Sequence, residues 1–341
     1  MSEKNNWITL NDGNKIPQIG IGVFKIESNQ KTEEACLEAL KIGYRHIDTA
    51  HSYHNERGVG RAIKKCNLKR EEIFVTSKLW PTEYGKDITL KAIDEMLERL
   101  QLDYLDLLLL HIPASEYVEA WKELEKAKEL GKVKSIGLSN FEGEVLEDIL
   151  KVAKIKPAVI QVKCNPYFNQ HEFKKIIKKD NILLEAWFPI GHGDPKLLND
   201  PLFEKLGKKY KKSNVQVILR WHLQENNIFI PKSSNPAHIM DNFNIFDFQL
   251  TKEEMDEILK KLGLVTKPKF DINVGDVVEI IAGPFRDQIA EVSAVNMEKE
   301  IVTVLVEMFG RSTPTEESFS HVKKINQALP KKEETEEDED N

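Results

Sequence analysis

The most apolar stretch of the chain, YLDLLLLHIP at residues 104–113, decides how the fold is interpreted. It is too short to cross a bilayer, which takes about 20 apolar residues in a helix, and it contains Asp106 and His111. We therefore interpret it as a buried strand. Its apolar residues are continuous rather than alternating, which is typical of a strand in a parallel sheet with a covered outer face.

Seven other short apolar runs share this character, and longer amphipathic patterns separate them between residues 19 and 260. Those patterns predict helices, such as the one over 115–131, which ends on a glycine as helices commonly do. The eight predicted strands are 19–22, 45–48, 73–78, 105–111, 133–139, 159–162, 182–187 and 227–233. Eight strand–helix units in roughly 240 residues are the number and size of a closed (β/α)8 TIM barrel. An open doubly wound sheet is the alternative, but no G-x-G-x-x-G turn follows an early strand.

The two ends of the chain differ from this pattern. Residues 1–18 contain the turn pair Asp12-Gly13 between two extended stretches, which predicts a β-hairpin under the barrel. The predicted domains are the barrel at 1–262, a linker at 263–269, a small all-β barrel at 270–326 and a tail at 327–341. Three β-rich segments with turn residues between them support the all-β domain. The last eleven residues hold seven acids and no apolar side chain, so we expect the tail to be disordered.

Composition narrows the class of protein. The chain has 341 residues, 40% of them apolar, and a net charge of −7, which argues against a nucleic-acid-binding surface across the whole protein. Its three cysteines, Cys36, Cys66 and Cys164, are not clustered, and the histidines show no metal-ligand spacing, so we expect neither disulfides nor a metal site. The N-terminus has no apolar signal region. These features favour a reducing cytoplasm and exclude a membrane span.

Polar residues follow the predicted strands at their carboxyl ends. In HIDTAHSYHNE (46–56), Asp48 ends the second strand and Tyr53 lies in the loop after it. Lys78 ends the third strand and His111 the fourth. Because the carboxyl ends of barrel strands share one face, the four side chains are expected to meet in one pocket. Three aromatic residues that follow the first, third and seventh strands are expected to line it: Phe24, Trp80 and Trp187.

These residue types suit one kind of proton transfer. A tyrosine with a pKa near ~10 is a poor acid at neutral pH, but a nearby ammonium favours the phenolate, and a carboxylate keeps that ammonium charged. Asp48 and Lys78 are therefore expected to tune Tyr53. With His111 orienting a substrate oxygen, the group can give a proton to a carbonyl oxygen while the carbon accepts hydride. Taken singly, each of the four is better explained as a surface or hydrogen-bonded polar residue; together they favour a reductase site.

Several longer sequence motifs in residues 5–260 match those of a known protein family. GYRHIDTAHSYHNERGVGRAI (43–63), TSKLW (76–80), LLLLH (107–111), IGLSNF (136–141) and IPKS (230–233) occur in order. This part of the chain resembles the aldo-keto reductase family. The resemblance implies a barrel that reduces aldehydes and ketones with NADPH, with a catalytic tetrad of Asp48, Tyr53, Lys78 and His111 and a substrate pocket at Phe24, Trp80 and His111.

The resemblance also implies a cofactor site. Ser139, Asn140 and Gln161 match residues that hold the nicotinamide carboxamide, and Trp187 matches an aromatic residue that stacks on the ring. Lys232 and Ser233 match residues at the 2′-phosphate. The full set implied for the cofactor is Val23, Ser139, Asn140, Gln161, Trp187, Lys232, Ser233, His238 and Asn242.

The chain departs from the family at several points. In KCNPY (163–167), Lys163 stands where the family has an acid and Asn165 where it has a histidine. His238 stands where many members carry an arginine for the 2′-phosphate. The C-terminal tail that closes the substrate pocket in the family has no counterpart, because the β-rich segment begins almost at once. That departure bears on the range of substrates.

Residues 274–325 resemble the KOW domain that ends the transcription factor NusG. The matching motifs are GDVVEIIAGPF (275–285) and FGRSTP (309–314), while Ala290 and the TEE at 315–317 depart from the family. The resemblance implies a protein partner, either termination factor Rho or a ribosomal small-subunit protein. Residues 264–330 hold seven basic and ten acidic side chains, which disfavours direct nucleic-acid binding. An inherited module without a partner is the alternative.

Two functions follow from the sequence. The first is an NADPH-dependent carbonyl reductase with a small carbonyl substrate. The second is an interaction protein in which the barrel senses nicotinamide and the KOW domain docks on transcription or translation machinery. No NusG N-terminal domain precedes the KOW segment. A natural fusion, a constructed chimera and a gene-model error would each explain why a reductase-like barrel is joined to a KOW domain. The intact set Asp48, Tyr53, Lys78 and His111 favours the enzyme.

The cofactor preference is testable directly. Lys232 predicts a preference for NADPH, but a neutral imidazole at His238 lacks the permanent charge and bidentate geometry of arginine. We therefore expect kcat/KM to favour NADPH with weak discrimination, so that NADH remains an alternative cofactor. A ratio of kcat/KM values in favour of NADH would contradict the prediction.

Overall fold

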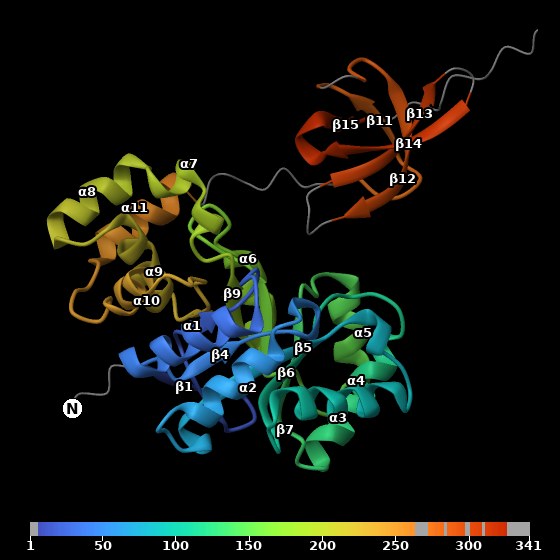
Figure 1. Cartoon of the computed structure of the whole chain (residues 1–341). Helices are drawn as coiled ribbons and strands as arrows, with labels where there is room; N and C mark the ends of the chain where they lie inside the picture. The colour runs from blue at the N-terminus through green and yellow to red at the C-terminus, as the bar shows by residue number, and fades with distance from the viewer. Residues whose placement is uncertain (1–5, 263–271, 283–284, 297–300, 309–310, 326–341) are drawn as a thin grey trace, which may run out of the picture. The chain divides into compact units, whose positions relative to one another are not determined.

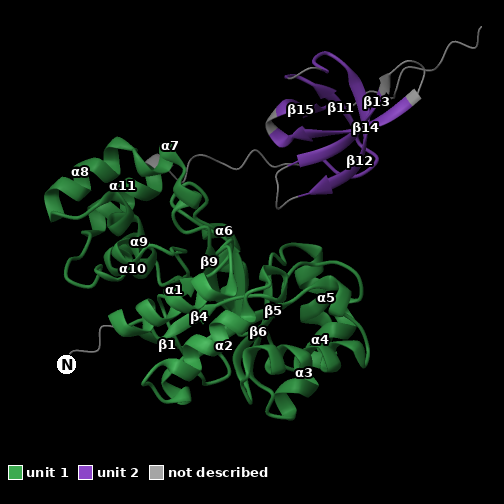
Figure 2. Cartoon of the chain, viewed as in Figure 1, with its two compact units in different colours: residues 1–265 green, residues 266–341 purple. Residues whose placement is uncertain are grey.

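The computed structural model describes residues 6–262, 272–282, 285–296, 301–308 and 311–325. The chain forms two compact units, 1–265 and 266–341 (Figure 2). Each unit has an apolar core of its own, so the two are described separately. The predicted linker at 263–269 and the predicted acidic tail at 327–341 lie outside the described residues.

The first unit is a closed barrel of eight parallel strands (Figure 1). The strands are β3 (Ile21–Gly22), β4 (His46–Asp48), β5 (Phe74–Leu79), β6 (Leu105–Leu110), β7 (Val133–Ser139), β8 (Val159–Lys163), β9 (Leu183–Trp187) and β10 (Ile228–Phe229). Each pairs with its neighbour in sequence order. Parallel bridges from Ile19 to Phe229 and from Gly22 to Lys232 join the last strand to the first. The predicted barrel is confirmed, and the alternative open sheet is wrong.

Helices follow the strands as predicted. They are α1 (Asn29–Ile42), α2 (Glu56–Lys65), α3 (Ile88–Leu100), α4 (Tyr117–Glu129), α5 (Glu144–Val152), α6 (His171–Ile177), α9 (Asn214–Gln224) and α10 (Pro236–Phe243). Three more were not predicted: α7 (Pro195–Leu198), α8 (Pro201–Tyr210) and α11 (Lys252–Leu262). α8 and α11 are joined by hydrogen bonds of Lys209 and Tyr210 to Glu254. Within the described ranges, no helix is both long and apolar enough to span a membrane.

A hairpin closes the amino-terminal end of the barrel. β1 (Trp7–Thr9) and β2 (Lys15–Pro17) pair antiparallel, as predicted from Asp12-Gly13. Leu10 and Ile16 of this hairpin belong to an apolar cluster with inward-facing strand residues, namely Phe74, Leu107, Leu109, Val159 and Ile228. The hairpin therefore fills one end of the barrel interior and leaves the other end for a site.

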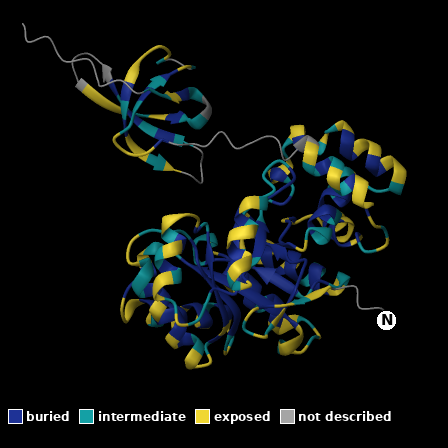
Figure 3. Ribbon diagram, turned by 180° about the vertical axis from the view of Figure 1, so that it is seen from behind, coloured by how far each residue is buried: buried dark blue, intermediate teal, exposed yellow. Residues whose placement is uncertain are grey.

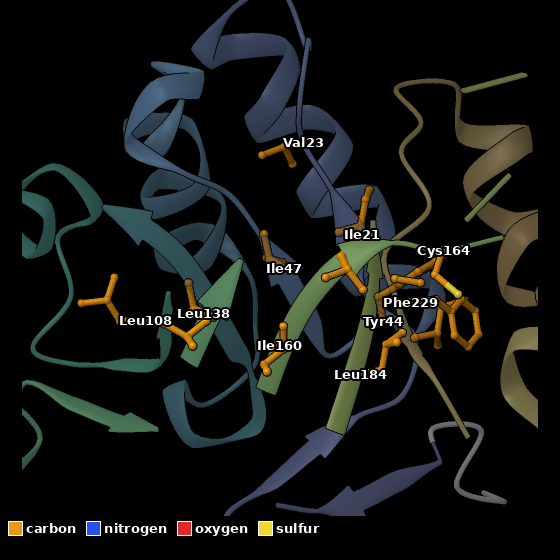
Figure 4. Packing of buried hydrophobic residues seen from close by; sticks show 14 of the residues in the cluster. Ile21, Val23, Tyr44, Ile47, Leu108, Leu138, Ile160, Cys164, Leu184 and Phe229 are labelled. Atoms are coloured by element: carbon orange, nitrogen blue, oxygen red, sulfur yellow. The ribbon is translucent and has the colours of Figure 1, made fainter. Parts of the chain in front are cut away.

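Alternation along each strand divides the buried residues into two sets. Outward residues such as Ile47, Leu108, Ile160 and Leu184 pack in the layer between strands and helices (Figure 4). Figure 3 shows the buried strands enclosed by helices whose outer faces are exposed. The residues between them face the interior, and toward the carboxyl ends they are polar and almost fully buried: His46, Asp48, Thr76, Lys78, Gln161 and Glu185. A polar layer thus lies above the apolar floor.

The second unit is all β. β11 (Val277–Ile280), β12 (Ile289–Asn296), β13 (Ile301–Met308), β14 (Arg311–Ser318) and β15 (Val322–Lys324) form an antiparallel sheet in the order β14-β13-β12-β11-β15. Its core is made mainly of valines and isoleucines from four of these strands. The predicted all-β fold is confirmed, but the interpretation of GRSTP (310–314) as a turn that separates β-rich segments is partly wrong, because β14 begins at Arg311. Pro314 lies within β14, which tolerates proline because it is an edge strand.

The contact between α2 and α3 provides a test of the packing. A Cβ placed on Gly60 of α2 would lie 2.1 Å from the carbonyl oxygen of Leu100 at the end of α3. Alanine at a helix position normally stabilises by about 1 kcal/mol over glycine, yet we expect Gly60→Ala to lower the free energy of unfolding by about 1–3 kcal/mol, as overpacking does.

Urea unfolding followed by tryptophan fluorescence measures this change, since all five tryptophans lie in the first unit. Lys64→Ala, at an exposed position of the same helix, is the control and should change little. A Gly60→Ala protein as stable as the wild type would contradict the packing described.

Candidate active site

The four side chains predicted to meet do so at the carboxyl end of the barrel. Lys78 Nζ lies 2.6 Å from Asp48 Oδ1 and 3.4 Å from the Tyr53 hydroxyl. The rings of Tyr53 and His111 have centroids 5.9 Å apart. Asp48 and Lys78 sit on β4 and β5, Tyr53 ends the short 3-10 turn His51–Tyr53, and His111 follows β6. Consecutive strand ends therefore supply the whole group.

Lys78 is the centre of the hydrogen-bond network. Its side chain is fully buried, and its ammonium donates to Asp48 Oδ1, to the Thr49 carbonyl at 3.0 Å and to the Tyr53 hydroxyl. An ammonium has three N–H groups, so these three acceptors use all of them. Since the Tyr53 oxygen accepts from Lys78, its own O–H points to another acceptor.

The charges in this network follow from burial and pairing. Burial alone would lower the pKa of Lys78, but Asp48 and the neighbouring Tyr53 outweigh it and raise that pKa above its ordinary value. Burial raises the pKa of Asp48, and the Lys78 ammonium opposes that effect. Burial, with help from the Lys78 charge, lowers the pKa of His111 to about 3. His111 is therefore neutral at physiological pH, with one ring N–H to donate.

Beneath the four residues lies a second polar layer. Gln161 Nε2 donates to Asp48 Oδ2 at 2.9 Å and to Glu185 Oε2 at 3.0 Å. Glu185 Oε1 is 3.7 Å from Nε2 of His46, which lies 3.0 Å from the Thr76 hydroxyl. Neither Glu185 nor His46 was among the site residues predicted from sequence. The signal for Glu185 was its place in LLEAW, two residues before Trp187 on the same strand face.

Two of the aromatic residues predicted to line a pocket lie beside the Tyr53 and His111 side chains. Trp80 packs edge-on against His111, with centroids 5.1 Å apart, and Phe24 lies 4.9 Å from the Tyr53 ring. Ser52 Oγ is 3.4 Å from His111 Nδ1. Phe24 is 40% exposed, which places it at the rim. A carbonyl group held here would be shielded on several sides by apolar rings.

The residues implied for the nicotinamide carboxamide form a connected group on β7 to β9. Asn140 Nδ2 donates to Ser139 Oγ and to the His111 carbonyl, each at 3.2 Å. Trp187 Nε1 donates to Asn140 Oδ1 at 2.8 Å. Asn140 has a φ of +63°, a left-handed conformation that asparagine tolerates. Hydrogen bonds thus tie Trp187 to the strand end that carries His111.

The other implied cofactor residues lie on the first and last strands and on α10. Val23 is buried, and its N–H donates to the Asp48 carbonyl at 3.1 Å. Lys232 bridges to Gly22 and is exposed, and Ser233 Oγ accepts from the Asn235 N–H at 3.0 Å. The remaining two are on α10, where His238 is exposed and Asn242 is buried. The structure places this set around the seam that closes the barrel.

The described ranges contain no cluster of residues that could bind a metal ion. There, no group of three or more His, Cys, Asp or Glu side chains has the arrangement of a metal site. Cys36, Cys66 and Cys164 are all free thiols.

A (β/α)8 barrel with polar side chains gathered at the carboxyl ends of its strands defines a class of barrel enzymes. Residues 18–262 match the aldo/keto reductase family, and residues 274–307 match the KOW motif. The chain belongs to the aldo/keto reductase family. The predicted aldo-keto reductase resemblance and the predicted KOW domain are confirmed, as is the enzyme class, an oxidoreductase, while the likeness to NusG stays a prediction.

Individual relatives match the first unit. Glyoxal reductase of Bacillus subtilis is 46% identical over 252 residues, which is 74% of this chain and 91% of the relative. An aldo/keto reductase crystal structure from Brucella melitensis superposes with a TM-score of 0.72 at 46% identity, covering 75% of this chain and 99% of that one. A Bombyx mori aldo-keto reductase solved in complex with NADP superposes with a TM-score of 0.71 at 34% identity, covering 75% and 92%.

The buried Lys78–Asp48 pair predicts a large coupling energy. Lys78→Met leaves the Asp48 carboxyl buried without its cation, so we expect the free energy of unfolding to fall by about 3–5 kcal/mol. Asp48→Asn in the Lys78→Met background should restore part of that loss. A double-mutant cycle by urea unfolding measures the coupling.

The exposed pair Lys208–Glu204 on α8 is the control. Lys208→Met should change stability by less than about 1 kcal/mol. Strictly additive costs for the Lys78 and Asp48 substitutions would show that the two charges do not depend on each other.

Proposed function

We propose that the first unit reduces aldehydes and ketones to alcohols with NADPH, with Tyr53 as the general acid. One observation carries the proposal. The three N–H groups of Lys78 are directed to Asp48, Thr49 and Tyr53, so a buried ammonium paired with a carboxylate donates to the Tyr53 oxygen and can stabilise the phenolate that proton transfer leaves.

The residues present fit a nicotinamide cofactor. Asn140 joins the Ser139 hydroxyl to the half-buried indole of Trp187 by hydrogen bonds, and the Gln161 amide lies on the next strand; these groups can bind a carboxamide beside an aromatic ring. The reduced cofactor, when bound, supplies hydride to the carbonyl carbon. The protein supplies orientation and the proton.

The proton transfer is prepared by two side chains. Neutral His111 donates its ring N–H to the carbonyl oxygen and orients it toward the Tyr53 hydroxyl. As negative charge develops on that oxygen, Tyr53 donates its proton, and the Lys78 ammonium stabilises the phenolate that remains. Asp48 keeps Lys78 charged throughout. This arrangement supports an enzyme over a sensor, which has no need of a proton donor.

Substrate and cofactor preferences follow from the relatives and from the residues. The relative named glyoxal reductase supports small, reactive aldehydes as substrates. The NADP complex of the Bombyx mori relative supports NADPH as the cofactor, and Lys232 is the cation for its 2′-phosphate. With the exposed imidazole of His238 in place of arginine, NADH is the weaker alternative.

For the second unit we propose binding to a protein partner. Among the residues that the structure describes, β14 pairs only with β13, so its outer edge can accept a strand from a partner. Rho and a ribosomal small-subunit protein are the candidates, and a role in transcription and a cytoplasmic location stay predictions. Affinity capture with the full chain tests the partner. Retention of neither protein would contradict it.

Tyr53→Phe tests the reductase. The change removes one hydroxyl, so we expect kcat for NADPH-dependent reduction of glyoxal to fall by about 10²–10⁴-fold, the range of general acid catalysis. The Kd for NADPH, measured by fluorescence titration, should stay within about twofold, since the hydroxyl acts on the substrate.

Tyr104→Phe is the matched control. Tyr104 precedes β6 at the amino-terminal end of the barrel, where Arg70 and Lys134 pack on its ring. Its loss should leave kcat unchanged. Full activity of the Tyr53→Phe protein would refute the assigned role.

A further inference from the structure

Glu185 is a buried carboxyl group that the reductase mechanism above does not use. It sits on β9, fully buried, between the apolar floor of the barrel and the tetrad. Its only hydrogen bond among the described residues is from Gln161 Nε2 at 3.0 Å, and Oε1 has no hydrogen-bond partner there. A carboxyl group is costly to bury without a function or strong partners.

The charges around Glu185 favour its uncharged form. The groups that face it are Asp48 and His46 from β4, Lys78 from β5 and Gln161 from β8. Lys78 is the one cation among these four, and its ammonium is hydrogen-bonded to Asp48. Two carboxyl groups that share one ammonium in a buried site do not both ionise readily. Burial first, and then the Asp48 charge, raise the pKa of Glu185 to about 8.

One more cation lies nearby on β8. Lys163 is two residues beyond Gln161 on the same strand face and therefore one layer closer to the mouth. Its ammonium lies over the rings of Phe168 and Phe188, at 4.6 and 4.9 Å from their centroids. It is not among the groups that shift the pKa of Glu185.

The hydrogen bonds of Gln161 fix which way its amide points. Both N–H groups of Nε2 are used, one by Asp48 Oδ2 and one by Glu185 Oε2. Two carboxyl oxygens on the same side require the nitrogen there and exclude the flipped amide. The amide oxygen has no donor among the described side chains. It is therefore available to accept an N–H from a ligand.

We propose that Glu185 is a positioning residue of the reductase site: an uncharged carboxylic acid that holds the nitrogen of Gln161 toward Asp48 and leaves the Gln161 oxygen for the carboxamide of the cofactor. The proposal rests on the proposed function and names a residue outside the tetrad and outside the implied cofactor set. It assigns Glu185 an effect on the nicotinamide half of the cofactor alone.

The first test removes the Glu185 carboxyl group, which accepts a hydrogen bond from Gln161. Glu185→Leu leaves one Gln161 N–H without a partner and frees the amide to turn, so the Kd for NADPH should rise about tenfold, which corresponds to the loss of one hydrogen bond of about 1.4 kcal/mol. The Kd for 2′,5′-ADP, which lacks the nicotinamide, should not change. An unchanged Kd for NADPH, or equal weakening of both ligands, would overturn the proposal.

The second test raises the pH so that the carboxyl group of Glu185 loses its proton. Because the carboxyl group ionises as pH rises through about 8, it then places a negative charge near the ring, which favours the positively charged NADP⁺ over NADPH. In full-length Tyr53→Phe protein, where residue 53 cannot ionise, the ratio Kd(NADPH)/Kd(NADP⁺) should rise about tenfold from pH 6.5 to 9.5. The phosphates are common to both ligands and cancel in the ratio.

The same ratio in the Tyr53→Phe/Glu185→Gln protein should stay level, because the amide cannot ionise. Glu123→Gln in the Tyr53→Phe background is the control, since Glu123 is equally buried but lies on α4 and pairs with Lys126. A rise that persists with Glu185→Gln would overturn the proposal. If the wild type binds neither NADPH nor NADP⁺, the proposed reductase function fails instead.

Discussion

A single buried ammonium organises this site. Lys78 satisfies its three N–H groups with a carboxylate, a backbone carbonyl and a phenol, all from the loop and strand end that begin at Asp48. A charge so deeply buried is stable only when it is paired, so Asp48 is needed for the fold as well as for the proposed proton transfer. The hydrogen bond from Lys78 to the Tyr53 oxygen depends on this pairing.

The barrel interior is arranged in layers, and the polar layer supplies the hydrogen-bond partners that the buried charges need. Apolar residues and the N-terminal hairpin fill the lower end, and polar residues occupy the same inward positions further along the strands. Room for them comes from glycine: a Cβ on Gly20 would lie 2.7 Å from His46 Nδ1. The network of Asp48, Gln161 and Glu185 then links three strands by hydrogen bonds through one amide.

Much of this was predictable from sequence, and the reasons are physical. Continuous apolar runs identify the strands of a parallel barrel, and the rule that strand carboxyl ends share a face brings Asp48, Lys78 and His111 together. Glu185 was missed because its place in LLEAW indicates only a buried acid, and its partner, Gln161, lies on the neighbouring strand. β14 was missed because its proline and polar residues are typical of a turn, and only its edge position permits them.

The charge state of Lys78 is the central claim, and nitrogen NMR of the side chain measures it directly. In ¹⁵N-labelled protein, with the signal assigned by its absence from Lys78→Met, the ε-nitrogen should keep its ammonium chemical shift at pH values where exposed lysines have begun to lose their protons. That result would agree with the raised pKa of Lys78. An ε-nitrogen that becomes a neutral amine below the titration of the exposed lysines would contradict the account.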